Sequence, residues 1–271
     1  MDVLGCAHKL IKILNIKTVG DIRHEMLYYD AGMYKPGGEK RAKEVLQQNV
    51  PWLLSTRLVN EVLETIRRMT YTERSAFHKT PGYIVNFKNG LLDTKNNELL
   101  PHTPELLIPY QFAVNFNPKA KCPRLEEFLK ESLGAKDRGT LQEFAGSILF
   151  ERDVCRKKAM IAVGPKDTSK STFGNVLVKV IGKDNFSGLP IQLFADKFAV
   201  ASLEHKHLNY VDDLSDADVA DRGKVKMVTG GGVITAEKKF GDRYPFTTFA
   251  KNYWKFSLHI CAWRGWNYAF S

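Results

Sequence analysis

The first 80 residues have hydrophobic and polar positions arranged mostly as in helices. Between the first two helical stretches, residues 26–29 and 33–35 have strand composition and flank a turn that contains Gly32. The pattern predicts an α-rich region with a short β-hairpin. Helices are expected over residues 1–16, 39–48 and 56–69.

From residue 82 onward the pattern changes to short strands and turns. Residues 83–87 have strand composition, and Asn89-Gly90 after them is a strong hairpin signal. Several prolines then mark a loop-rich connector, which is followed by two expected helices, over residues 122–133 and 140–150. The two expected domains are residues 1–150 and 151–271.

The second part of the chain combines short apolar runs with one helical pattern. The helix carries apolar residues between 173 and 181 and is expected to stop at Gly182. Residues 190–203 are predicted to form another helix, and residues 233–246 a hairpin. Together these elements predict an α/β fold with a central sheet. The expected strands are residues 159–163, 208–211 and 254–260.

The strongest chemical signal in the chain is a phosphate-binding motif. A strand, a turn-rich segment that ends in Lys170-Ser171 and a helix follow one another, as a P-loop requires. Backbone N–H groups and the positive end of the helix would point at the phosphates. Lys170 would reach the β- and γ-phosphates of ATP, and the Ser171 hydroxyl would hold Mg²⁺. The candidate nucleotide-binding residues are Gly164, Pro165, Asp167, Thr168, Ser169, Lys170, Ser171 and Thr172.

Ser169 stands where the motif has a glycine immediately before the lysine. If the loop requires a positive φ at this position, a side chain costs roughly 1–2 kcal/mol of strain. If it does not, the serine is harmless and its hydroxyl could donate to a phosphate. The alternative for the whole segment is a lysine- and serine-rich turn between a strand and a helix.

Two adjacent carboxylates, Asp212 and Asp213, follow the strand expected over residues 208–211. ATPases of this class need one carboxylate to orient Mg²⁺ and its waters, and another to position or deprotonate the attacking water. We therefore interpret Lys170, Asp212 and Asp213 as catalytic residues, and Ser171 with Asp212 as the metal ligands. The alternative is a solvated turn after a strand.

The hairpin expected over residues 233–246 carries Lys238, Lys239 and Arg243 near its tip. Basic side chains on a hairpin beside an ATPase core suit contacts with the phosphate backbone of DNA without base readout. The alternative is an edge strand that lysines protect from pairing. A net charge of +10 and a pI near 9.3 also favour nucleic acid as a partner, although many basic proteins have none.

The cysteines and histidines give little evidence for a metal site or a disulfide. The four cysteines are far apart and include no Cys-x-x-Cys pair, which fits a reducing cytoplasm. His205 and His207 could mark a metal site, but a solvated connector between a helix and a strand is the commoner context. No apolar run approaches the ~20 residues of a membrane span, so no membrane partner is expected.

The order of these motifs resembles the ATPase part of the phage and plasmid primase–helicase family, within the superfamily 3 helicases. The resemblance implies an ATP-driven DNA helicase of viral or plasmid replication, with an α-rich region before an AAA+-like P-loop ATPase core. It also implies single-stranded or forked DNA as a partner and a homo-oligomeric ring, usually a hexamer, with Lys238 and Lys239 contacting the DNA. The matching stretches are residues 28–34, 89–93, 101–104, 122–129, 164–172, 226–231 and 236–239.

Three departures from the family pattern keep a second interpretation open. Ser169 replaces the loop glycine, and Gly232 stands where the family usually has aspartate. After Phe256 the family has a strand that ends in a sensor asparagine and, later, an arginine finger, whereas this chain continues with residues 257–263 and stops soon afterwards. The alternative is therefore a C-terminally incomplete relative that binds nucleotide or DNA without unwinding it. An unrelated P-loop kinase is a third possibility.

Overall fold

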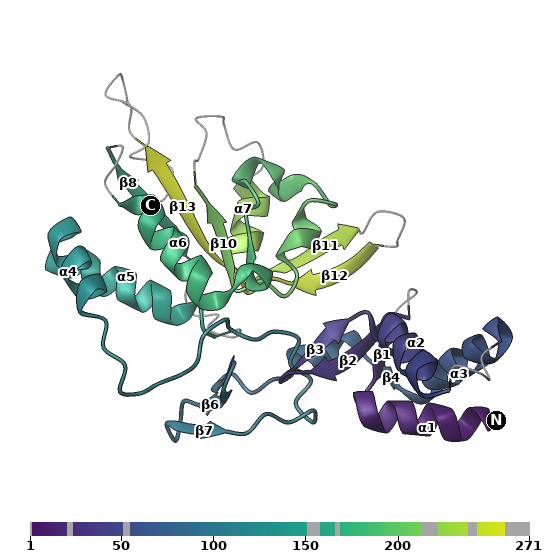
Figure 1. Ribbon diagram of the computed structural model, residues 1–271. Helices are drawn as coiled ribbons and strands as arrows, with labels where there is room; N and C mark the ends of the chain where they lie inside the picture. The colour runs from purple at the N-terminus through teal and green to yellow at the C-terminus, as the bar shows by residue number, and fades with distance from the viewer. Residues whose placement is uncertain are drawn as a thin grey trace. The chain divides into compact units, whose positions relative to one another are not determined.

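The computed structural model describes residues 2–20, 24–50, 55–150, 158–165, 169–212, 222–237 and 243–257 (Figure 1). In these ranges no helix combines the length and the apolar character needed to cross a membrane. The chain forms two compact units. The first comprises Met1–Lys119, Val180–Asn185 and Glu237–Tyr244, and the second comprises Ala120–Lys179, Phe186–Ala236 and Pro245–Ser271.

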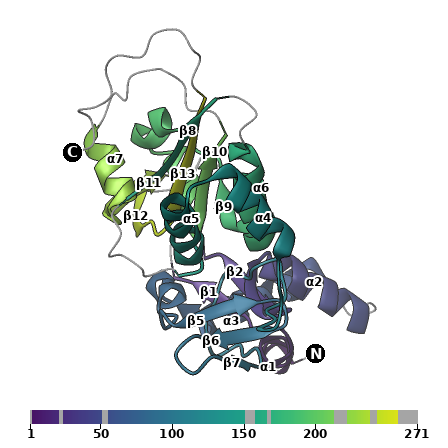
Figure 2. The ribbon, with the colours of Figure 1, turned by 90° about the vertical axis from the view of Figure 1, so that its left-hand side faces the viewer.

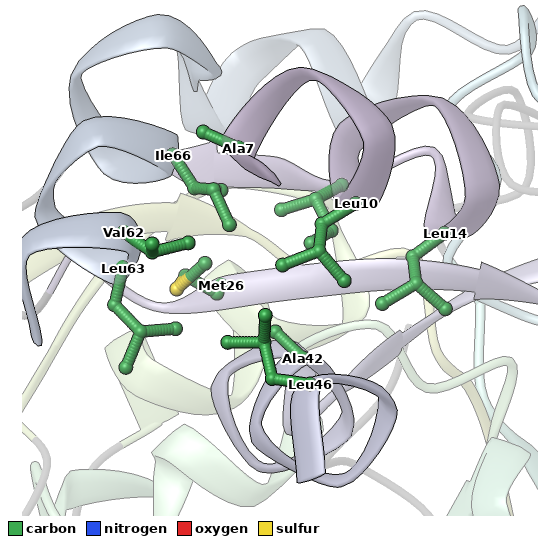
Figure 3. Close-up of a cluster of buried hydrophobic side chains, with 10 residues drawn as sticks. Ala7, Leu10, Leu14, Met26, Ala42, Leu46, Val62, Leu63 and Ile66 are labelled. Carbon is green, nitrogen blue, oxygen red and sulfur yellow. The ribbon is translucent and has the colours of Figure 1, made fainter. Parts of the chain in front are cut away.

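Three amphipathic helices enclose the main core of the first unit. They are α1 (Val3–Leu14), α2 (Gly38–Asn49) and α3 (Thr56–Met69), and each was expected from its apolar spacing. The Asp2 carboxylate caps α1 by accepting hydrogen bonds from the backbone N–H groups of its first turn. Figure 3 shows the labelled helical side chains gathered around Met26. The core residues are Ala7, Leu10, Leu14, Ile16, Met26, Ala42, Leu46, Val62, Leu63 and Ile66.

A four-stranded sheet, in the order β3-β2-β1-β4, packs with these helices. The predicted hairpin is confirmed: β2 and β3 pair antiparallel, and the turn between them uses positive φ at Ala31 and Gly32. β4 pairs parallel with β1 and is followed by the 3₁₀ turn η2 (Arg74–His78). The strands are β1 (Lys17–Val19), β2 (Met26–Asp30), β3 (Met33–Pro36) and β4 (Tyr71–Thr72).

A second, three-stranded antiparallel sheet belongs to the same unit. It consists of β5 (Ile84–Phe87), β6 (Gly90–Asp93) and β7 (Glu98–Leu100), and the Asn89-Gly90 turn joins its first two strands as predicted. The φ of Gly90 is +153°, and a Cβ at this residue would lie 2.5 Å from the carbonyl oxygen of Leu100. Only glycine therefore allows β7 to approach so closely.

His102 connects the two hairpins of the first unit. Its Nε2 lies 2.8 Å from the carbonyl oxygen of Phe87, and a Cβ at Gly32 would lie 2.6 Å from its ring. Nearby, the Asn86 amide donates to the carbonyl oxygen of Gly32 at 2.9 Å, and the Tyr34 hydroxyl donates to that of Pro104 at 2.9 Å. Two of the stretches that carry the family resemblance, residues 28–34 and 101–104, therefore meet in one hydrogen-bonded region.

The second unit is built on a four-stranded parallel sheet in the order β8-β13-β10-β9. Because neighbouring strands are parallel, their carboxyl ends lie along one edge, where open α/β sheets bind ligands. Figure 2 shows α6 (Lys170–Ile181) and α7 (Arg222–Thr229) on opposite faces of this sheet. The α/β class predicted from the sequence is confirmed. The strands are β8 (Met160–Gly164), β9 (Phe186–Ser187), β10 (Leu208–Val211) and β13 (Lys251–Ser257).

Two further helices and one small sheet complete the described elements. The helices α4 (Pro123–Ser132) and α5 (Ala135–Ser147) belong to the second unit although they precede residue 150. The division of the chain at residue 150 stays a prediction. Strands β11 (Val233–Glu237) and β12 (Arg243–Thr247) form a two-stranded sheet, which agrees with the expected hairpin. A 3₁₀ turn, η3 (Lys183–Asn185), follows α6.

The helix predicted over residues 190–203 is wrong. The chain forms two 3₁₀ turns instead, η4 (Ile191–Ala195) and η5 (Val200–Leu203). Asp196 separates them, because its backbone is extended and its carboxylate accepts hydrogen bonds from the N–H groups of Phe198 and Ala199 at 2.7 and 3.0 Å. A side chain that captures backbone donors in this way competes with a continuous helix.

Candidate functional site

Lys170 lies where β8 and α6 approach each other. β8 ends at Gly164 and α6 begins at Lys170, as the sequence motif predicts. The Lys170 ammonium donates hydrogen bonds to the carbonyl oxygen of Gly164, at 2.9 Å, and to that of Pro165. These contacts hold the positive charge at the carboxyl end of the sheet, beside the amino end of α6. Two of the predicted nucleotide-binding residues, Asp167 and Thr168, lie outside the described residues.

Ser169 has a φ of +64°, in the left-handed region. The loop therefore has a positive φ at the position where the motif has glycine. The serine at this position is strained. The expected cost is roughly 1–2 kcal/mol. The Ser169 carbonyl oxygen also accepts the hydrogen bond from the Phe173 N–H at 3.2 Å, which places this residue at the start of the helix.

Asp212 follows β10 directly and lies at the same edge of the sheet. The Tyr210 hydroxyl donates to its Oδ1 at 2.5 Å, and this hydrogen bond is the largest of the effects that hold the pKa of Asp212 below its ordinary value. A hydrogen bond with Ser171 and the charge of Lys255 act in the same direction, while partial burial opposes them. Asp212 is therefore a carboxylate at neutral pH. Asp213, the second predicted acid, lies outside the described residues.

Lys255 connects the beginning of α6 to the end of β10. Its Nζ donates to the Ser171 hydroxyl oxygen at 3.0 Å and lies 3.3 Å from Asp212 Oδ1. Ser171, Asp212 and Lys255 thus form a closed group of hydroxyl, carboxylate and ammonium. Lys170 is joined to this group through its chain neighbour Ser171. Lys255 was not predicted from the sequence, where its one signal is a charged residue inside a strand that also carries Tyr253 and Trp254.

Two tyrosines support this group from the sheet. The Tyr253 hydroxyl donates to the carbonyl oxygen of Lys170 at 3.1 Å, and the rings of Tyr210 and Tyr253 have centroids 5.5 Å apart. Burial, together with the nearby charge of Asp212, raises the pKa of Tyr253 to about 12. Burial and the hydrogen bond to Asp212 also raise the pKa of Tyr210. Both phenols therefore stay protonated and act as donors.

A cavity of about 530 Å³ opens beside Lys170. It is bounded by α4, α5, β8 and the start of α6, and its size is typical of small-molecule sites. Most of its lining is apolar, while Asp137 and Thr140 of α5 contribute polar groups. The apolar lining residues are Phe128, Leu129, Leu133, Leu141, Met160, Ile161, Ala162, Val163 and Phe173.

The oxygens of Ser171 and Asp212 fit the predicted magnesium site. Hydroxyl and carboxylate oxygens are the donors that Mg²⁺ prefers in proteins, and here both already face one cation, the Lys255 ammonium. Across the described ranges no three His, Cys, Asp or Glu side chains form a cluster that could hold a metal by themselves. Ser171 and Asp212 are therefore the described residues that could contribute ligands to a magnesium ion.

The predicted DNA-contacting hairpin is described only in part. Arg243 of β12 has a side chain that is 68% exposed and forms an ion pair with Glu237 at 3.2 Å. Such an exposed pair is weak and leaves the guanidinium accessible to another anion. Lys238 and Lys239 lie outside the described residues.

His207 is buried, which corrects the expectation of a solvated connector. Its side chain is 1% exposed, and its Nδ1 hydrogen-bonds to the carbonyl oxygen of Ile148 at 2.9 Å. Burial lowers the pKa of His207 to about 3, so the imidazole is neutral and Nδ1 is the donor. The sequence could not show this, because the carbonyl that accepts the hydrogen bond comes from a distant part of the chain.

Comparisons with known proteins relate both parts of the chain to existing families. Residues 5–134 match the family model described as D5 N terminal like, and residues 162–254 match a family of unknown function (DUF5906). The first match covers the stretches that carry Gly32, Asn89-Gly90 and His102, and it supports the relationship to the phage primase–helicase family.

Solved structures show the same fold. The A-form apo structure of the NrS-1 C-terminal region is 13% identical, with a TM-score of 0.61, and the match covers 95% of this chain and 57% of that one. An apo structure of the same region is 12% identical, with a TM-score of 0.59, and the match covers 94% of this chain and 57% of that one. This chain therefore spans little more than half the length of the NrS-1 region.

Proposed function

We propose that the chain binds ATP with Mg²⁺ and hydrolyses it as the motor of a superfamily 3 DNA helicase in viral or plasmid replication, in the cytoplasm of a host cell. One observation carries the proposal: the Ser171 hydroxyl and the Asp212 carboxylate, from α6 and β10, meet at Lys255, beside Lys170. A hydroxyl from the helix start and an acid from another parallel strand are the groups that a P-loop ATPase needs around its metal.

Each residue has a distinct part in the proposed reaction. The amino end of α6 and the backbone before it would bind the phosphates. Lys170 would exchange its contacts with the carbonyl oxygens of Gly164 and Pro165 for the β- and γ-phosphates. Ser171 and Asp212 would hold Mg²⁺, which on binding would neutralise charge that develops on the phosphates. Asp213 would orient or deprotonate the attacking water.

The cavity beside Lys170 suits the base and ribose of the nucleotide. A triphosphate held at the start of α6 would direct the rest of the molecule toward α4 and α5, where the lining is mainly apolar. Asp137 and Thr140 offer an acceptor and a hydroxyl to polar atoms of the base or the sugar.

The proposed DNA partner is supported by charge. The chain has a net charge of +10, and Arg243 is exposed on the β11–β12 hairpin that also carries Lys238 and Lys239. Contacts from these residues to phosphates would be independent of base sequence and sensitive to salt. A ring of identical subunits around single-stranded or forked DNA would place one such hairpin per subunit near the strand.

Steady-state ATP hydrolysis with and without single-stranded DNA tests the proposal. Lys170→Ala is expected to abolish DNA-stimulated turnover, while Lys179→Ala, an exposed residue of the same helix, should leave it unchanged. ATP binding without any turnover by the unsubstituted chain would favour the second candidate, a nucleotide- or DNA-binding relative that does not unwind DNA. Absence of ATP binding in isothermal titration would overturn the ATPase and leave only the DNA-binding form of the second candidate.

A further inference from the structure

Lys255 places a positive charge where the proposed function needs a metal. Its ammonium lies 3.0 Å from Ser171 Oγ and 3.3 Å from Asp212 Oδ1, the two oxygens assigned above to Mg²⁺. Building on that proposed function, we propose that Lys255 is an internal counter-ion for this pair, which occupies the magnesium position until nucleotide and Mg²⁺ bind together.

The sheet holds Lys255 at this position. Residue 255 belongs to β13, which lies between β8 and β10 and pairs with both. The adjacent Tyr253 and Trp254 are each 1% exposed, so the strand has little freedom to shift. The Lys255 side chain itself is 16% exposed, compared with 60% for that of Asp212. The lysine therefore reaches the carboxylate from the protein side, and the solvent side of Asp212 stays open.

The chemistry of an ammonium matches the two oxygens. A lysine offers three N–H donors on a compact charge, and Ser171 and Asp212 supply two acceptors. The hydroxyl of Ser171 accepts from Lys255 at 3.0 Å and can donate to Asp212 at the same time. Lys255 and Asp212 therefore balance each other's charge, and Ser171 contacts the ammonium, without a metal.

An ammonium and a magnesium ion cannot share these oxygens. At such short distances two cations repel each other strongly, even when water screens part of the field. Mg²⁺ alone would have to displace Lys255 with no compensating anion, so its affinity for the nucleotide-free protein should be low. A nucleotide brings phosphate oxygens to which the displaced ammonium can turn. Binding of Mg²⁺ and of nucleotide is thus expected to be strongly coupled, with Lys255 as the source of the coupling.

Isothermal titration of MgCl₂ into the nucleotide-free full chain tests this role. Lys255→Met keeps the length of the side chain and removes its charge, and it is expected to raise the affinity for Mg²⁺ by about tenfold or more, the scale of one removed charge contact. Lys255→Arg, which keeps the charge, and Lys179→Met, at an exposed site of α6, should match the unsubstituted chain. A merely structural lysine would not produce tighter metal binding when it is removed.

The outcomes separate this inference from the proposed function. Unchanged Mg²⁺ affinity in Lys255→Met, with ATP still binding in the presence of Mg²⁺, would overturn the counter-ion role alone. Failure of every variant and of the unsubstituted chain to bind ATP with Mg²⁺ would overturn the proposed function. If Lys255→Met does not fold, the unsubstituted chain still tests the counter-ion role. Tight binding of Mg²⁺ to this chain without nucleotide would overturn that role, because Lys255 could not then occupy the magnesium position.

Discussion

The ring of Tyr210 lies against the backbone of Gly174, so closely that a Cβ on residue 174 would be 2.4 Å from the ring. This contact joins β10 to α6, and the Tyr210 hydroxyl continues it to Asp212. The position of the Asp212 carboxylate relative to Ser171 therefore depends on glycine at residue 174, about one helical turn after Ser171.

Gly174→Ala is expected to destabilise the protein by about 1–3 kcal/mol, because the added methyl group overpacks the contact with Tyr210. It should also weaken ATP binding, because Asp212 moves with Tyr210. Urea unfolding and isothermal titration measure the two effects. Gly139→Ala in α5 is the control: a Cβ there meets nothing within 4 Å, and the helix should gain up to about 1 kcal/mol. Equal effects of the two substitutions would contradict the packing argument.

Ser169→Gly is expected to stabilise the folded chain by about 1 kcal/mol, because glycine adopts the φ of +64° without strain. Ser169→Ala removes the hydroxyl but keeps the Cβ, so its free energy of unfolding should stay near that of the unsubstituted chain. Chemical denaturation of the three proteins compares these free energies. A larger gain from alanine than from glycine would show that the hydroxyl, and not the backbone, is the source of the cost.

His207 should make stability depend on pH in the acid range. Its pKa is about 3 in the folded protein and about 6.5 in the unfolded chain, so the unfolded state binds the extra proton first. The contribution of His207 to the free energy of unfolding is therefore constant above about pH 6.5. Below that pH it falls by up to about 1.4 kcal/mol per pH unit. Denaturation at pH 7.5 and pH 5 measures the loss. His207→Gln should reduce the slope, whereas His8→Gln, at an exposed site of α1, should retain it.

Thr140→Trp should separate binding of the base from binding of the phosphates. The indole would fill the cavity that α5 lines, and the affinity for ATP should fall about tenfold or more, since a base and ribose no longer fit. Affinity for inorganic tripolyphosphate, which needs only the start of α6, should change little. Lys136→Trp places the same ring on an exposed site of α5 as a control. Parallel losses for both ligands would show that the cavity is unrelated to the base.

Local patterns explain how much of the fold could be predicted. The helices α1 and α3 have apolar residues on one face, and the β2–β3 and β5–β6 turns have glycines at positions of positive φ. Such signals involve residues within a few positions of each other, and they are accurate for that reason. Residues 190–203 also have helical spacing, but the Asp196 side chain takes up the backbone donors that a helix would need.

The candidate site was predictable only where it is local. Lys170 and Ser171 belong to one motif, and Asp212 follows a recognisable strand. Lys255 was not predicted, because a lysine in an alternating strand normally faces solvent, and its contact with Asp212 arises from the strand order β8-β13-β10. That order depends on pairing between segments about 90 residues apart, which no local pattern encodes.

The same strand order bears on how the protein is made. The ribosome delivers β8 and β10 well before β13, yet in the folded sheet these two strands do not pair with each other, because β13 lies between them. A nascent chain that has emerged only as far as Asp212 carries Lys170 at the start of α6 and Asp212 after β10, but it lacks Lys255 and the strand that joins β8 to β10. The edges of β8 and β10 that face β13 therefore stay unpaired until residues 251–257 have left the exit tunnel, and unpaired strand edges favour aggregation.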